Sequence, residues 1–171
     1  MARAGRPRAS YVQLAAGQAK ACPTKPCWIL LNLLHALPPG GLEVRAMDGS
    51  PSVAELFTHI RYVRLVLVSE DAPEFAGELP EKEWVFEPDP NRIAEMLKTS
   101  AAVVREAVRR TVEAGREMQV HYDHPILLLQ HLLWHEGYHH GQIKLALKLA
   151  GCSIPDREAG PLTWGVWMRK S

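Results

Sequence analysis

The stretch HPILLLQHLLWHEGYHHGQIKLALKLAG, residues 124–151, predicts one long helix that contains most of the histidines of this sequence. His124-Pro125 can open the helix because proline is tolerated at the first helical position, and Gly151 can end it. Leucines recur along it at helical intervals, and at 1.5 Å per residue the helix is roughly 35–40 Å long. A helix of this length needs long partners, which indicates a helical bundle.

Three further segments with helical periodicity precede this one. The first begins near Pro26 and stops before Pro38-Pro39. The second begins at the capping box Ser52-Val-Ala-Glu55 and runs for about 18 residues. The third begins at Asp89-Pro90 and ends near Gly115. We therefore predict an all-α fold, a four-helix bundle.

The segments outside these helices differ in composition. Residues 70–89 contain eight acids and three prolines, which predicts an acidic loop held to the body of the protein by Trp84 and Phe86. Residues 1–10 are expected to form a flexible basic tail, and residues 11–171 a single domain. The aromatic C-terminal tail that starts at Pro161 is expected to pack on the bundle.

The composition excludes several classes of protein. The chain has 171 residues, of which 47% are hydrophobic and 23% charged, with a formal net charge of +1. It can bury a core, so intrinsic disorder and a disulfide miniprotein are excluded. The balanced charge argues against nucleic acid as a partner, and the longest apolar run is too short to span a membrane. Irregularly spaced thiols indicate a reducing, cytoplasmic location; they are Cys22, Cys27 and Cys152.

Six of the eight histidines lie between residues 121 and 140. On a helix, His135 and His139 are one turn apart on the same face, so both rings can reach one metal ion. His131 is one turn earlier and Gln142 is close to one turn later, so we interpret both as residues that orient a ligand or line a polar pocket. His140 points about 100° away and is expected on the surface.

Two histidines do not hold a metal tightly, so we expect a third ligand from a facing helix. His59 is the only histidine of the second helix, and it lies beside that helix's core positions. Three nitrogen ligands with open positions are typical of a catalytic metal, and they suit a divalent transition metal such as zinc or nickel. The same H-x-x-x-H spacing also arises by chance on amphipathic helices.

These residues resemble those of the DinB/YfiT-like family of metal-dependent proteins. The resemblance rests on SVAELFTH (residues 52–59) and HLLWHEGYHHGQI (residues 131–143), and it covers about residues 27–150. It implies an up-down-down-up four-helix bundle whose metal is held by His59, His135 and His139. His140 stands where the family usually has arginine.

The resemblance also implies an activity. Several relatives look like thiol-S-transferases or isomerases that use a low-molecular-weight thiol such as bacillithiol, mycothiol or glutathione. In such a reaction the metal activates the thiol, or a water, for attack on a small electrophilic substrate. Relatives are commonly homodimers, and the sequence leaves a homodimer open.

Two alternatives remain at this point. His135, Glu136 and His139 also fit the H-E-x-x-H motif of zinc hydrolases, in which Glu136 would be the general base and Glu158 could supply the third ligand. No strand is predicted that could hold an extended peptide beside it. Glu136 is instead expected to point toward a neighbouring helix or to make an ion pair, or to lie with His131 and Gln142 around the metal ligands or the substrate pocket. The other alternative is a non-catalytic bundle, stabilised by metal, that acts as a stress or binding protein.

Overall fold

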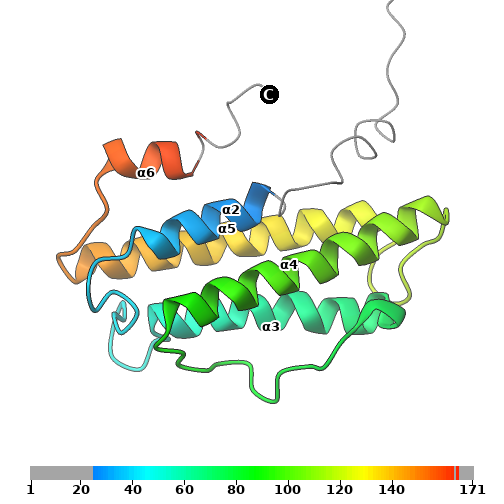
Figure 1. Cartoon of the computed structure of the whole chain (residues 1–171), viewed down its shortest axis with the longest axis horizontal. Coiled ribbons are helices and arrows are strands. Elements are labelled where there is room, and N and C mark those ends of the chain that lie inside the picture. The colour runs from blue at the N-terminus through cyan, green and yellow to red at the C-terminus, as the bar shows by residue number, and fades with distance from the viewer. Residues whose placement is uncertain (1–24, 164, 166–171) are drawn as a thin grey trace, which may run out of the picture.

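The computed structural model describes residues 25–163 and residue 165. Among these residues, four long helices form a bundle (Figure 1), which confirms the all-α prediction. The long helices are α2 (Lys25–His35), α3 (Val53–Asp71), α4 (Pro90–Glu113) and α5 (Pro125–Leu149). A 3-10 turn, η1 (Pro73–Phe75), follows α3, and a short helix, α6 (Asp156–Leu162), follows α5 and contacts α2. The expected basic tail, Cys22 and most of the aromatic C-terminal tail lie outside the described residues.

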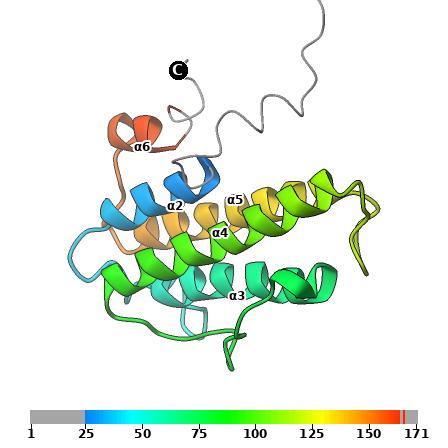
Figure 2. The same ribbon diagram turned by 45° about the vertical axis from the view of Figure 1, so that its right-hand side comes forward.

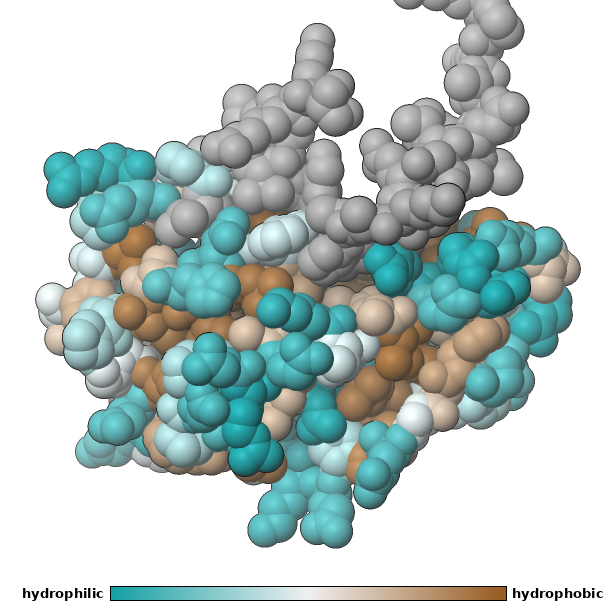
Figure 3. Space-filling model, viewed as in Figure 1, coloured by the Kyte–Doolittle hydropathy of each residue, from teal (hydrophilic) through white to brown (hydrophobic). Residues whose placement is uncertain are grey.

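The helices follow the up-down-down-up order. Helices α2 and α5 run in one direction, and α3 and α4 run in the other (Figures 1 and 2). Because α3 and α4 are parallel neighbours, the chain must return along the bundle between them. Residues 72–89 make this return beside α3, and they form the hydrophilic projection at the lower edge of the molecule (Figure 3). The predicted acidic loop is therefore the crossover connection of the bundle.

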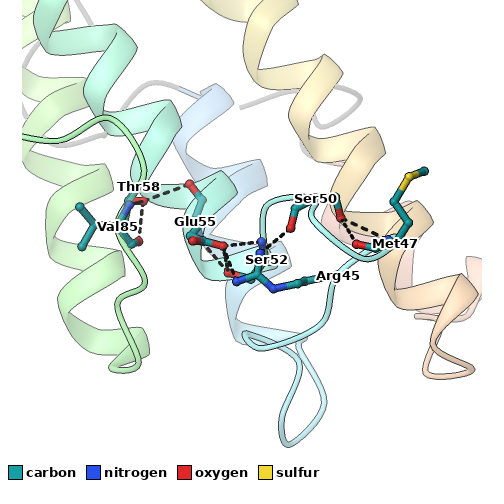
Figure 4. Close-up of polar contacts among 7 residues, drawn as sticks. All are labelled: Arg45, Met47, Ser50, Ser52, Glu55, Thr58 and Val85. Atoms are coloured by element: carbon teal, nitrogen blue, oxygen red, sulfur yellow. Dashed lines mark hydrogen bonds and ion pairs between the residues drawn. The ribbon is translucent and has the colours of Figure 1, made fainter.

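The start of α3 is fixed by the predicted capping box. The Ser52 hydroxyl accepts a hydrogen bond from Glu55 N at 3.2 Å, and Glu55 Oε2 accepts one from Ser52 N at 2.7 Å (Figure 4). Arg45 pairs with the same carboxylate at 2.9 Å. Hydrogen bonds from Ser52, chiefly from its backbone, lower the pKa of Glu55 despite partial burial. This cap sets the phase of the helix, and His59 lies one turn after Glu55.

The apolar core consists of two clusters along the bundle axis. One joins α2 with the first halves of α3 and α4 and the second half of α5, and its members include Leu30, Phe57, Ile60, Leu97 and Ile143. The other joins the second half of α3 with the second half of α4 and the first half of α5, and its members include Val68, Val104, Ala107, Leu128 and Leu132. Polar side chains of α3, α4 and α5 occupy the positions between the two clusters. None of the described helices is long and apolar enough to cross a membrane.

Candidate metal site

Three histidines from two helices converge on one point. His59 Nε2 of α3 lies 3.1 Å from His135 Nε2 of α5, and His139 Nε2 lies 3.0 Å from the same atom. His59 and His139 are only 8% and 6% exposed, and His135 is half-buried. Each of the three residues offers a ligand atom within 4.8 Å of the other two, close enough to hold one metal ion. The structure therefore brings together the three histidines that the sequence pointed to.

The outer nitrogens of two of these rings face oxygen atoms. His139 Nδ1 lies 2.7 Å from the side-chain oxygen of Gln142, as expected of a residue that orients a ligand. His59 Nδ1 lies 3.0 Å from Glu83 Oε1, in a contact that is poorly aligned as a hydrogen bond. Both oxygens favour a proton on Nδ1, which leaves Nε2 as an unprotonated acceptor. This is the arrangement of histidines that bind a metal through Nε2.

The protons and the spacing of the three rings show whether these residues fit a metal ion. His135 Nε2 faces two acceptor nitrogens and can donate a proton to only one of them. His135 Nδ1 is buried and has no hydrogen-bond partner among the described residues. Two ligand atoms that lie about 2.0–2.1 Å from one ion are roughly 3 Å apart when they meet it at right angles. The measured nitrogen separations and the converging lone pairs therefore fit a metal ion.

Burial keeps the three rings neutral. It lowers the pKa of His135 to about 3, with further contributions from His139 and His59. Burial also lowers the pKa of His59 and that of His139, against opposing effects of Glu83 and Gln142. Neutral imidazole is the form that binds metal, so the site is ready for a cation at neutral pH.

The crossover loop covers one side of the site. The Trp84 ring stacks on the His59 ring, with centroids 4.1 Å apart and planes 3° from parallel. The neighbouring Thr58 hydroxyl donates to Val85 O at 2.8 Å and accepts from Val85 N at 3.2 Å, which ties the loop to α3 (Figure 4). Trp84 therefore holds the loop to the body of the protein. Glu83 was not predicted from the sequence, because it is one of many acids in the crossover loop and carries no local signal of its contact with His59.

Glu136 does not point at the histidines. Arg64 Nε and Nη2 both lie 2.8 Å from Glu136 Oε1, and both side chains are buried. The carboxylate is therefore held inside the bundle by an ion pair, where it cannot act as a general base for the site. Glu158, on α6, has a side chain that is 55% exposed and is not part of the histidine group. The geometry argues against the zinc-hydrolase alternative.

Two other histidines occupy different surroundings. His131 is exposed, and its Nδ1 lies 2.7 Å from the Tyr122 hydroxyl rather than at the other three histidines. His140 is not the surface residue that we predicted, because it is half-buried and its Nε2 is inaccessible. The error has a physical cause: α2, α3 and α4 all contact α5, so a position about 100° from His135 can still face a neighbouring helix.

A cavity of about 510 Å³ lies at one end of the bundle, where α2 ends and α4 begins. Its walls include Leu34, His35, Phe86 and Pro90. None of the three converging histidines lines it, so it is separate from the candidate metal site.

Comparison with known proteins agrees with the architecture. The family model described as the DinB superfamily matches residues 29–143, more than half of the chain, which confirms the family that the sequence motifs indicated. Searches among curated proteins and among solved structures found no match.

Proposed function

Because the chain belongs to the DinB superfamily, we propose that it binds a divalent transition metal through His59, His135 and His139 and acts as a metal-dependent transferase on small molecules. The proposal rests on one observation, the convergence of three Nε2 atoms at the meeting point of α3 and α5. Imidazole donors suit zinc and nickel. A low-molecular-weight thiol is the proposed cosubstrate, and a small electrophile is the proposed substrate.

When bound, a divalent transition metal acidifies a thiol or water at its open position and so supplies a nucleophile at neutral pH. Residues around the three histidines hold these metal ligands in place. Glu83 and Gln142 face the outer nitrogens of His59 and His139, which fixes the tautomer of each ring. Trp84 covers one face of the His59 ring and keeps water from it. All three ligands are neutral, so they leave the positive charge of the ion undiminished.

The residues around the histidines favour a reaction in which a thiol attacks the substrate over one in which water attacks it. A zinc hydrolase of the H-E-x-x-H type uses the glutamate of that motif to activate water, and here the motif offers Glu136 for that role. That carboxylate lies 2.8 Å from Arg64 inside the bundle. A thiol loses its proton more readily than water and needs no such base once it is coordinated.

The first test is metal content and affinity. Protein purified without an affinity tag is analysed for metals, stripped with a chelator and titrated with Zn²⁺ and Ni²⁺ by calorimetry. We expect one ion per chain. In His59→Ala we expect the affinity to fall by more than the roughly 100-fold that results from replacing a residue that only orients a ligand. His35→Ala, at an exposed histidine outside the site, is the matched control. A wild-type protein that binds no transition metal would refute the proposal.

The second test is activity. The metal-loaded protein is assayed with several low-molecular-weight thiols and a chloro-aromatic electrophile. We expect turnover with at least one thiol that disappears when the metal is removed or His59 is replaced. Metal binding without turnover for any thiol would support the non-catalytic alternative instead.

A further inference from the structure

A buried ion pair separates the two core clusters. Arg64 of α3 is 2% exposed and Glu136 of α5 is 7% exposed. These are the two helices that supply the three histidines. Glu136 directly follows His135 in the chain and comes three residues before His139. The ion pair and the candidate ligands are therefore placed by the same two helices at the same level of the bundle.

Arg64 joins three helices through all of its nitrogens. Nε and Nη2 each lie 2.8 Å from Glu136 Oε1 on α5. Nη1 donates to Leu97 O at 2.9 Å and to the Ser100 hydroxyl at 3.1 Å, both on α4. A planar guanidinium with fixed partners on two neighbouring helices has little freedom to move. The pair is accordingly rigid in position and in direction.

Stability alone does not explain this pair. A buried ion pair loses the solvation of both charges, and replacing such a pair by apolar side chains is often neutral or stabilising. Here the second carboxylate oxygen, Glu136 Oε2, is also buried without a hydrogen-bond partner in the described part of the chain. The energetic cost of keeping these charges inside suggests that they do something other than stabilise the fold.

The apolar pattern of α5 does not by itself specify how this helix is rotated in the bundle. Apolar side chains lie on its outer face as well as its inner face, and the exposed ones are Ile126, Leu127, Leu133, Trp134, Leu145 and Leu149. A helix that is apolar all round can bury nearly any face, so apolar burial specifies its rotation weakly. A directional polar contact can specify what the apolar pattern leaves open.

We propose that the Arg64–Glu136 ion pair positions α5 against α3, in rotation and along its axis, and so brings His135 and His139 to His59. This inference rests on the proposed metal site. A rotation of α5 by one residue, about 100°, would turn both of its histidines away from His59. Arg64 and Glu136 touch no ligand atom, and they act through the helices that present the ligands.

The test replaces the pair by apolar residues of similar size, Arg64→Met with Glu136→Leu. Three quantities are measured: urea unfolding of the metal-free protein, Zn²⁺ affinity by competition with a chelator, and the visible absorption spectrum of bound Co²⁺. We expect unfolding at the same or a higher urea concentration, Zn²⁺ affinity reduced at least about tenfold, and an altered Co²⁺ spectrum. The control is Arg109→Met with Glu113→Leu, which removes the partly exposed ion pairs that Arg109 makes with Glu106 and Glu113 within α4, and we expect it to leave all three readouts unchanged.

The outcomes separate this inference from the proposed function. If the wild type binds Zn²⁺ and Co²⁺ and the apolar double variant binds them equally well with the same spectrum, the positioning role is wrong and the metal site stands. If the wild type binds neither ion, both proposals fail. If the double variant does not fold, the Arg64→Lys variant is tested instead, because lysine keeps the positive charge but lacks the planar guanidinium that binds two partners at once. A folded Arg64→Lys protein with wild-type affinity and spectrum overturns the inference, and one with weakened binding supports it.

Discussion

Two buried polar groups lie side by side between α3 and α5, and they differ in how well they are satisfied. In the Arg64–Glu136 pair, opposite charges face each other, and α4 supplies further acceptors to the arginine. In the histidine group, three Nε2 atoms face one another, and the protons available cannot satisfy them all. Buried polar groups are normally paired. The comparison indicates that the opposite charges of the ion pair balance each other within the protein, although Glu136 Oε2 has no hydrogen-bond partner among the described residues, whereas the three converging nitrogens can hold a cation.

The largest effect is expected from removing one partner of the Arg64–Glu136 ion pair. Glu136→Leu leaves Arg64 charged and buried without its partner. Because an uncompensated buried charge is expensive, we expect the free energy of unfolding to fall by about 3–5 kcal/mol, measured by urea denaturation.

The matched control for Glu136→Leu is Glu113→Leu on α4. The Glu113 side chain is 54% exposed and pairs with Arg109 at 2.8 Å. An exposed pair of this kind contributes little to stability, because solvent screens both charges. Similar losses in the two variants would show that Arg64 is solvated when it loses its partner, and that the ion pair is not a closed unit.

Metal loading tests the other half of the comparison. If the histidine group is completed by a cation, a free metal concentration one hundred times the Kd stabilises the folded state by about 2.7 kcal/mol. Thermal unfolding with and without Zn²⁺ measures this shift. In His139→Ala we expect the shift to disappear. An equal shift in wild type and His139→Ala would place the binding elsewhere on the chain.

The sequence predicted most of the fold because the helix ends carry local signals. Ser52 with Glu55, and Asp89 with Pro90, mark helix starts that depend on neighbouring residues only, and the structure has caps at both. The one-turn spacing of His135 and His139 follows from helix geometry alone. Their meeting with His59 was expected because a lone histidine lay beside core positions of a facing helix.

Features that depend on packing between distant segments were predicted only in part, because an ion pair of Glu136 was expected but its partner was not. Arg64 lies between Val63 and Leu65, and nothing local shows that its charge is buried against α5. Glu83 is one of many acids in the crossover loop, and only the path of that loop along α3 brings it to His59. His140 was misplaced because the number of helices that surround α5 is a property of the whole bundle.

The stability of the metal-free protein in acid depends on the histidine group. Burial lowers the pKa of His135 to about 3 in the folded protein, whereas an unfolded histidine titrates near 6.5. Above pH 6.5 neither state holds a proton on this ring. As the pH falls from 6.5 towards the folded-state pKa, the unfolded chain binds a proton that the folded protein does not. The metal-free protein then loses stability, by at most about 1.4 kcal/mol per pH unit for each such histidine.

Urea unfolding of the metal-free protein at pH 7, 6 and 5 measures this loss. His135→Gln should make the decline between pH 6.5 and pH 5 shallower, because it removes one of the groups that stay neutral on folding. His35→Gln, at the exposed end of α2, serves as the control and should leave the decline unchanged. Parallel declines for wild type and His135→Gln would mean that His135 is protonated in the folded protein as readily as in the unfolded chain.

The smallest expected effect concerns the contact between the crossover loop and His59. Glu83→Gln removes the charge that faces His59 Nδ1 while keeping the size of the side chain. Carboxylates that face the outer nitrogen of a histidine ligand raise its basicity and fix its tautomer, so we expect Zn²⁺ affinity to fall about tenfold, measured by calorimetry. Glu81→Gln removes an equal charge from the same loop at an exposed position and controls for long-range attraction of the cation. If the two variants weaken binding equally, the loop contributes only its negative charge. If Glu83→Gln alone weakens it, the contact between Glu83 and His59 Nδ1 itself strengthens metal binding, as expected of a carboxylate that faces the outer nitrogen of a ligand.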